Sequence, residues 1–330
     1  MNRHDRLHAA LRGGNPDRVP VSAWGHWYLR EMSAEAFADV MVEFQQRYDW
    51  DFCKLHARAS YHAEGFGFRH RPSTRADTVH ETLHSPIATP QDWRKLRPLP
   101  LSTPALAEQL QAIDLVKRAL GDAVPVIMTV FLPLDIAYKL SDKNGAMLAE
   151  HIHADEEAVA SALGVFTETF VPFIEAVVKR GVDGIYFSTK WANAHRLTEP
   201  HYRRLARPFD LAMIEAAKSL PCNLLHLCED GIYLDALSDY PVAGFHWESQ
   251  TKGNPSPGTA LKRLPGHAAV AGGVDPYTLA HGRPAEVRMK AEDAIRQADG
   301  RRFVLGPGCS ILTAATPHEN LQALRDASRS

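Results

Sequence analysis

The chain has 330 residues, a formal net charge of −2 and 45% hydrophobic residues, enough to bury a large core. Its charged residues are spread evenly without a basic stripe, so no nucleic-acid partner is expected. The N-terminal residues lack the apolar core of a signal peptide and no uninterrupted apolar run approaches the length of a membrane span, so we expect a cytoplasmic protein that binds no membrane. In that compartment, four cysteines favour free thiols or metal ligands over disulfides.

The first third of the chain combines helical and extended patterns with a long irregular stretch. A short helix at 6–11 precedes a first extended segment at 18–26, and apolar positions at helical spacing predict a helix at 34–48. A second strand follows at 51–55. Residues 57–103 are rich in His, Arg, Gly and Pro and predict an unusually long loop, which in compact domains is often functional.

From residue 103 onward, strands and helices alternate regularly. The strands are expected at 124–131, 183–188, 222–227, 244–248, 267–273 and 302–305. The helices are expected at 103–120, 134–150, 155–180, 200–219, 230–237, 284–298 and 317–327. Eight short apolar strands, most of them followed by a helix, predict a single-domain (β/α)8 TIM barrel over residues 1–330. The competing doubly wound sheet would need a glycine-rich dinucleotide turn after its first strand, and the sequence has none there.

The fifth predicted strand ends in the clearest chemical signal of the chain. His226 and Cys228 are two residues apart, so they point to the same face, about 6 to 7 Å apart along the strand. An imidazole and a thiolate are two of the ligands that zinc takes. Active sites of such barrels lie at the C-terminal ends of the strands, so Glu248 and Cys309 would reach the same rim. We therefore predict a zinc site of these four residues, with His246 as a spare ligand or outer partner.

Each of these residues also has a plainer interpretation. A buried cysteine is usually a small core hydrophobe, which we expect for Cys53 and Cys222. Glu248 could be a solvated loop carboxylate, and His-x-Cys alone is a weak metal signal, because closed zinc sites usually contain C-x2–4-C pairs. The metal site is favoured because Cys309 is expected at the same rim as the His-x-Cys pair.

The sequence resembles the uroporphyrinogen decarboxylase superfamily over nearly the whole chain, beginning at Asp17-Arg18-Val19-Pro20. The other segments that carry the resemblance are His226-Leu227-Cys228, Ala271-Gly272-Gly273-Val274-Asp275-Pro276, Leu305-Gly306-Pro307-Gly308-Cys309 and Thr316-Pro317-His318-Glu319-Asn320-Leu321. Within the superfamily, His-x-Cys with a late cysteine is similar to methylcobamide:coenzyme M methyltransferases and, more distantly, to cobalamin-independent methionine synthase. In the latter, a Glu between these segments is also a ligand, and Glu248 lies where that resemblance places it.

The resemblance implies a zinc-dependent methyltransferase that moves a methyl group from a corrinoid such as methylcobalamin, or a similar carrier, to a small-molecule thiol. Two cysteinate ligands would keep the bound substrate sulfur nucleophilic, and Glu248 would be the ligand that the thiol displaces. The sequence leaves open whether the corrinoid arrives free or on a corrinoid protein. It also leaves open whether the barrel forms a homodimer.

Several further residues are candidates for the substrate pocket: His246, Asp275, Tyr277, Tyr138, His62 and Arg69. The segment 57–103 could cover the mouth of the barrel and recognise an anionic part of the substrate or carrier, or it could be a solvated surface loop. Asp275 and Tyr277 follow the seventh strand, where a turn aspartate before Pro276 and a packed aromatic are the plainer interpretations.

Two alternatives remain at this point: a uroporphyrinogen decarboxylase-type tetrapyrrole enzyme, and a barrel that binds a corrinoid or tetrapyrrole without catalysis. The decarboxylase pattern departs from this sequence at its working residues. Its arginine-rich motif is replaced by Tyr28-Leu29-Arg30-Glu31-Met32, and its Gly-His-Gly reads Gly306-Pro307-Gly308 here. Its substrate-binding aspartate closes the second strand, where this chain has His56-Ala57-Arg58. Losing that carboxylate argues against uroporphyrinogen as the substrate.

Overall fold

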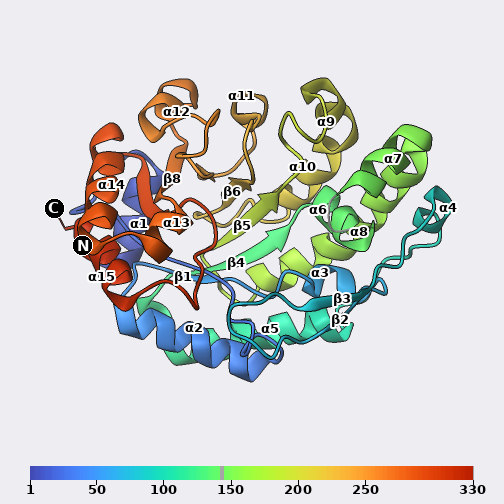
Figure 1. Cartoon of the computed structure of the whole chain (residues 1–330), viewed down its shortest axis with the longest axis horizontal. Helices are drawn as coiled ribbons and strands as arrows, with labels where there is room; N and C mark the ends of the chain where they lie inside the picture. The colour runs from blue at the N-terminus through green and yellow to red at the C-terminus, as the bar shows by residue number, and fades with distance from the viewer. Residues whose placement is uncertain (142–144, 330) are drawn as a thin grey trace.

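The computed structural model, which describes residues 1–141 and 145–329, contains one curled sheet of parallel strands surrounded by helices (Figure 1). The sheet has seven strands in the order β1-β4-β5-β6-β7-β8-β9. They are β1 (Cys53–Leu55), β4 (Val126–Phe131), β5 (Gly184–Thr189), β6 (Leu224–Leu227), β7 (Gly244–His246), β8 (Ala269–Val274) and β9 (Phe303–Pro307). Nearly every residue in these strands is buried, which explains their continuous apolar runs.

Helices cover the outer face of this sheet, and each longer helix buries one apolar stripe (Figure 1). In chain order the helices are α1 (Arg3–Leu11), α2 (Ala34–Tyr48), α3 (Tyr61–Glu64), α4 (Pro90–Trp93), α5 (Pro104–Leu120), the 3-10 turn η1 (Gly121–Ala123), α6 (Pro133–Ser141), α7 (Ala146–Ala154), α8 (Glu156–Val178), α9 (Glu199–Leu205), α10 (Arg207–Glu215), α11 (Leu234–Leu237), α12 (Pro257–Arg263), α13 (Pro276–His281), α14 (Pro284–Gln297) and α15 (His318–Ala327).

Seven of the eight predicted strands are confirmed, but the first, at 18–26, forms only isolated bridges. Val21 bridges to Leu305 of β9 in parallel, and Leu305 donates its N–H to the carbonyl of Pro20 (2.8 Å). On the other side, Asp51 donates its N–H to the carbonyl of Val21 (2.9 Å), just before β1 begins. The segment therefore lies between the two edge strands, although Pro20 lacks the N–H that a regular ladder needs.

A buried carboxylate fastens this segment to its neighbours. Asp51 is fully buried and accepts hydrogen bonds from the side chains of Arg6 (2.8 Å) and Arg18 (2.6 Å) and from the backbone N–H of Val21 (2.8 Å). Three donors on one buried carboxylate link α1, the 18–26 segment and the start of β1.

The predicted loop at 57–103 contains more regular structure than expected. It includes the antiparallel hairpin of β2 (Arg69–Arg71) and β3 (Glu81–His84), together with the one-turn helices α3 and α4. The hairpin strands are three and four residues long and mostly exposed, so they show no apolar alternation that a sequence pattern could reveal.

Three helix predictions also differ from the structure in detail. The prediction at 134–150 corresponds to α6 and α7, and residues 142–144 of it lie outside the described residues. The helix predicted at 200–219 is divided at Ala206 into α9 and α10. The helix predicted at 230–237 is reduced to the single turn of α11, whereas α12 and α13 were not predicted.

Among the described residues, α8 is the one helix long and apolar enough to cross a membrane by length and composition. Half of its most apolar window is buried, and α8 packs against α6, α7 and α10. In this fold α8 belongs to the layer of helices outside the sheet, and its buried part packs against the neighbouring helices.

Candidate metal centre

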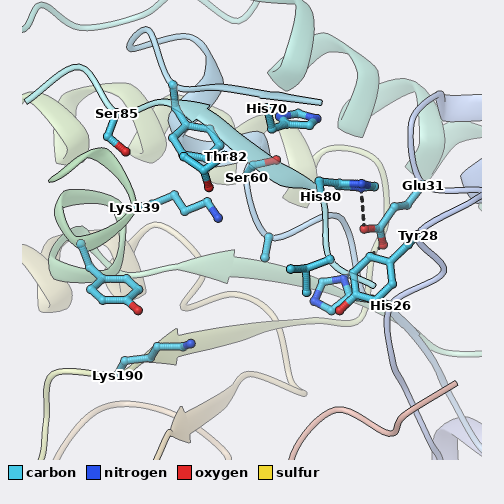
Figure 2. Close-up of a pocket in the computed structure, with 14 residues that line it drawn as sticks. His26, Tyr28, Glu31, Ser60, His70, His80, Thr82, Ser85, Lys139 and Lys190 are labelled. Atoms are coloured by element: carbon cyan, nitrogen blue, oxygen red, sulfur yellow. Dashed lines mark hydrogen bonds and ion pairs between the residues drawn. The ribbon is translucent and has the colours of Figure 1, made fainter. Parts of the chain in front are cut away.

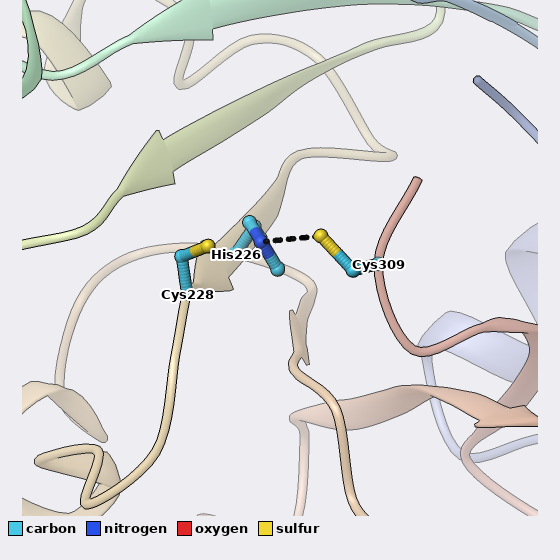
Figure 3. A group of neighbouring side chains, drawn as sticks. All are labelled: His226, Cys228 and Cys309. Atoms are coloured by element: carbon cyan, nitrogen blue, oxygen red, sulfur yellow. Dashed lines mark hydrogen bonds between the residues drawn. The ribbon is translucent and has the colours of Figure 1, made fainter. Parts of the chain in front are cut away.

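The structure brings three of the four predicted ligands together at the carboxyl ends of the strands. His226 lies on β6, Cys228 directly follows it, and Cys309 follows β9. Their ligand atoms all lie within 4.8 Å of one another, and the sulfur of Cys309 is 3.9 Å from Nε2 of His226 (Figure 3). Zinc binds sulfur and nitrogen at about 2.0–2.3 Å, so small side-chain rotations would let one ion reach all three atoms.

The two thiols are electrostatically coupled. A hydrogen bond from Cys228, assisted by His226, holds the pKa of Cys309 well below its usual range despite its burial. The same hydrogen bond, together with burial, raises the pKa of Cys228. A cation that bound both sulfurs would release any proton that the pair still carried.

His246 lies behind His226 and determines how that ring is oriented. Its Nε2 donates to the carbonyl of Pro307 (2.7 Å), and burial lowers its pKa to about 3, so its Nδ1 is an acceptor at neutral pH. Nδ1 of His226 has two acceptors of His246 within reach, Nδ1 at 2.7 Å and the backbone carbonyl at 3.3 Å, so it is the donor nitrogen of that ring. Nε2 of His226, 3.9 Å from the sulfur of Cys309, is then the nitrogen available to a metal ion. The structure therefore places His246 as the outer partner of His226.

Glu248, the fourth predicted ligand, lies outside this group of three. Its Oε1 accepts the backbone N–H of Gln250 (2.9 Å), and its Oε2 is buried with no hydrogen-bond partner among the described residues. Burial raises the pKa of Glu248 to about 7. A buried carboxylate oxygen without a partner, packed against the residue before Cys309, fits a role toward a cation.

Gly308 allows this packing because it has no side chain, and it predicts a sharp effect of substitution. A Cβ on Gly308 would lie 2.1 Å from Oε2 and 2.9 Å from Cα of Glu248. Gly308→Ala must therefore separate Glu248 from the Cys309 loop, and we expect it to cost about 1–3 kcal/mol of unfolding free energy. Thermal unfolding of the purified variant measures this cost.

Gly266→Ala is the matched control, because a Cβ at Gly266 would meet no atom within 4 Å. If both variants unfold at the wild-type temperature, the close approach of Gly308 to Glu248 is not tight in solution.

Sequence analysis missed a buried polar cluster beside the three ligands. Lys54 on β1 is 3% exposed, and its Nζ donates to Nδ1 of His56 (2.7 Å) and to Oγ1 of Thr129 (2.9 Å). Nε2 of His56 is 2.9 Å from Oγ of Ser310, the residue after Cys309. Burial holds the pKa of Lys54 well below its usual range, although Cys309 opposes this effect. The signal in the sequence that could have revealed this cluster was Lys54, a single charged residue within a short apolar strand.

A small cavity of about 260 Å³ lies between the β2–β3 hairpin and the rim of the sheet (Figure 2). Lys139 of α6 and Lys190, just after β5, line one side. On the other side, the buried carboxylate of Glu31 pairs with His26 (3.1 Å) and His80 (3.1 Å). Lys139 and Lys190 thus place two amino groups across the cavity from this carboxylate.

This cavity is connected to the ligand group through intervening residues at two points, although none of the three ligands lines it. The ring centroid of His26 is 4.4 Å from that of His56, which contacts Ser310. At the other end, Lys190 follows Thr189, whose carbonyl accepts the backbone N–H of Cys228 (2.9 Å). Burial lowers the pKa of Lys190, but Cys228 and other nearby groups outweigh it and raise the pKa overall.

The remaining predicted pocket residues are distributed unevenly. Tyr138 lines the cavity. His62 is buried against Phe131, with ring centroids 4.2 Å apart, and does not line it. The other three, Arg69, Asp275 and Tyr277, also lie outside its lining.

Of the plainer interpretations of the residues after β8, the turn aspartate fits Asp275, whereas the packed aromatic is wrong for Tyr277, which is largely exposed. Asp275 caps α13 by accepting the N–H of Thr278 (2.7 Å) and pairs with Lys290 (2.7 Å). Tyr277 is 73% exposed, with its ring against His281. Neither side chain belongs to the group of three ligands.

Comparison with known proteins gives a consistent pattern over the whole chain. The family model described as Uroporphyrinogen decarboxylase (URO-D) matches residues 2–330. A uroporphyrinogen decarboxylase from Mycobacterium sp. (strain KMS) is 25% identical over 351 aligned positions, covering 94% of this chain and 93% of the relative. One from Synechococcus sp. (strain CC9605) is 25% identical over 259 positions, covering 75% and 70%.

Among solved structures, a methyltransferase from Methanosarcina mazei superposes with a TM-score of 0.88 at 21% identity, covering 100% of this chain and 98% of that one. A B12-independent methionine synthase from Shewanella sp. W3-18-1, in complex with selenomethionine, gives a TM-score of 0.60 at 14% identity, covering 96% and 94%. At these identities the similarity establishes a shared fold.

Proposed function

The chain belongs to the uroporphyrinogen decarboxylase (URO-D) family, and on that basis we propose that it is a zinc-dependent methyltransferase. It would move a methyl group from a corrinoid, or a similar carrier, to a zinc-activated thiol. The observation that carries the proposal is the convergence of His226, Cys228 and Cys309 from two distant parts of the chain. The fold shared with a methyltransferase and a methionine synthase supports it.

The residues present suit the proposed ion. His226, Cys228 and Cys309 would hold it, and the unpartnered oxygen of Glu248 makes this residue the candidate for a fourth ligand that the substrate displaces. Bound zinc would keep a thiol substrate deprotonated at neutral pH, where a free thiol with a pKa of about 8.5 is mostly protonated. His246 contributes by fixing the ring orientation of His226.

The size of the cavity indicates which of the two proposed substrates, the thiol or the corrinoid, it could hold. A cavity of about 260 Å³ is smaller than the roughly 300–1,000 Å³ of typical drug-sized ligand sites, so it suits a small thiol better than a macrocycle. Lys139 and Lys190 would face an acidic group on that thiol or on the carrier. We place the corrinoid outside, at the mouth. We also infer that the 18–26 segment closes the sheet into a complete eight-stranded barrel, since it bonds to both β9 and β1.

Decarboxylation of a tetrapyrrole is the second candidate, supported by the names of the curated relatives. Two positions oppose it. The family's aspartate at the end of the second strand is absent, and His56, which occurs there, bonds internally to Lys54 and Ser310. Pro307 occupies the centre of the family's Gly-His-Gly, and its carbonyl is already bonded to His246.

One assay distinguishes the candidates. Purified protein, analysed for zinc, is incubated with methylcobalamin and either 2-mercaptoethanol, 3-mercaptopropionate or 2-mercaptoethanesulfonate, and loss of the methylcobalamin absorbance is followed. We expect about one zinc per chain and thiol-dependent demethylation. A parallel incubation with uroporphyrinogen should yield no coproporphyrinogen. Coproporphyrinogen formation by metal-free protein would overturn the proposal in favour of the decarboxylase. Binding of either macrocycle without turnover or zinc would overturn it in favour of a non-catalytic barrel.

A further inference from the structure

Lys54 is a buried lysine in an unusual setting. It lies on β1 and is 3% exposed, and it forms no ion pair with a carboxylate among the described residues. Its Nζ lies instead against Nδ1 of His56, Oγ1 of Thr129 and the rings of Tyr186 and Trp24, whose centroids are 3.9 and 5.3 Å away. Burying an amino group without an opposite charge is costly, and an apolar side chain of similar length would be less costly at this position.

One branch of contacts leads from Lys54 to Cys309. Nζ donates to Nδ1 of His56, so the other nitrogen of that ring carries the proton and donates to Oγ of Ser310 (2.9 Å). Ser310 directly follows Cys309 in the chain. The position of the Cys309 backbone on the loop after β9 is therefore tied to the side chain of a residue on β1.

The second branch leads from Lys54 to His226. The ring of Tyr186 lies under the ammonium group, and its hydroxyl is 2.7 Å from Nδ1 of His246, the outer partner of His226. The Tyr186 ring also stacks on the imidazole of His226, with centroids 5.5 Å apart and planes 23° apart. Tyr186 thus contacts both His226 and the residue that orients it.

We propose that Lys54 is a positioning residue: through His56 and Tyr186 it holds two metal ligands, Cys309 and His226, in fixed positions relative to each other. The inference rests on the metal site of the proposed function and adds residues that neither the ligand pattern nor the family resemblance identified. It explains why a buried lysine, which is costly, occurs at this point of the sheet. Outer partners of metal ligands typically contribute roughly 10–100-fold to metal affinity.

The proposal makes an unusual combined prediction for Lys54→Met. The methionine keeps the apolar stem and removes the buried amino group, so the thermal midpoint of the metal-free protein should stay the same or rise. Zinc affinity, measured by competition with a chromogenic chelator, should fall roughly 10–100-fold. A purely structural lysine would give the opposite result: a lower midpoint with unchanged affinity.

Variants along the two branches locate the effect. His56→Leu removes the contact to Ser310 and should lower the zinc affinity by a similar factor. His56→Gln retains a side-chain donor and should recover most of the affinity. Tyr186→Phe keeps the ring and removes the hydroxyl contact to His246, and should weaken zinc as well. Thr129→Val is the matched control: it removes a partner of Lys54 that otherwise bonds only to the carbonyl of Leu55, and should leave the affinity within about threefold.

Cobalt substitution gives a readout that is independent of activity. At saturating cobalt, Cys309→Ala offers one thiolate fewer, so the near-ultraviolet thiolate-to-cobalt absorption per bound ion should fall by about half. In His56→Leu and Lys54→Met both thiolates remain, so the band should be shifted or broadened but not halved. If wild-type protein binds neither zinc nor cobalt, the proposed function fails together with this inference. If wild-type protein binds zinc and Lys54→Met and His56→Leu bind it equally well, this inference alone is overturned.

Discussion

Cys309→Ala is expected to abolish tight zinc binding and to lower the rate of methyl transfer by about 10²–10⁴-fold. The alanine removes one of three atoms that lie within 4.8 Å of one another, and it leaves His226 and Cys228 as a two-ligand site. Metal analysis after dialysis and the methylcobalamin assay measure the two effects. Because Cys309 is only partly buried, the variant should fold with little change in unfolding free energy.

Cys222→Ala is the control for this experiment. Cys222 is a free thiol in the core below the sheet rim, so its substitution removes a cysteine without touching the ligand group. We expect wild-type zinc content and rate, with a loss of stability that reflects the small cavity left behind. Full zinc content and full rate in Cys309→Ala would remove the basis of the proposed function.

Asp51→Ala is expected to have the largest effect on stability, about 3–5 kcal/mol of unfolding free energy. The carboxylate is fully buried and neutralises Arg6 and Arg18 while accepting the N–H of Val21. Its removal leaves Arg18 without its carboxylate partner and the buried N–H of Val21 without its acceptor, whereas Arg6 keeps Asp17. Denaturant unfolding followed by circular dichroism measures the difference.

Asp17→Ala is the matched control, because Asp17 also pairs with Arg6 (2.7 Å) but its side chain is 40% exposed. Exposed pairs contribute little, so we expect a loss below about 1 kcal/mol. Equal losses in the two variants would show that the Asp51 network does not join the 18–26 segment to the sheet in the way described.

The convergence of the three proposed ligands could be predicted because two simple rules apply to them. Strand alternation puts His226 and Cys228 on one face, and the common rim of parallel strands brings in Cys309. Glu248 was predicted by the same rules, yet its Oε2 packs against Gly308, outside the group of three. The rotation of its side chain decides whether Glu248 joins the group, and the common rim of parallel strands gives no information about that rotation.

Lys54, His56 and Tyr186 could not be found in this way because their roles depend on contacts across the barrel interior. Lys54 contacts Thr129 and Tyr186, which are 75 and 132 positions later in the chain, and no local pattern relates them. For the fold, apolar runs identified seven strands. The first segment was overpredicted because its apolar residues do reach the core, although Pro20 interrupts the ladder.

The separation of the ligands along the chain has a consequence for the order of assembly. His226 and Cys228 are contributed by β6, whereas Cys309 takes its place only when β9 has docked between β8 and the 18–26 segment. An imidazole and a single thiolate retain zinc poorly, so the half-built barrel cannot keep the ion. Metallation should thus be the closing event of maturation, coincident with docking of the final strand, rather than a nucleus around which the polypeptide folds.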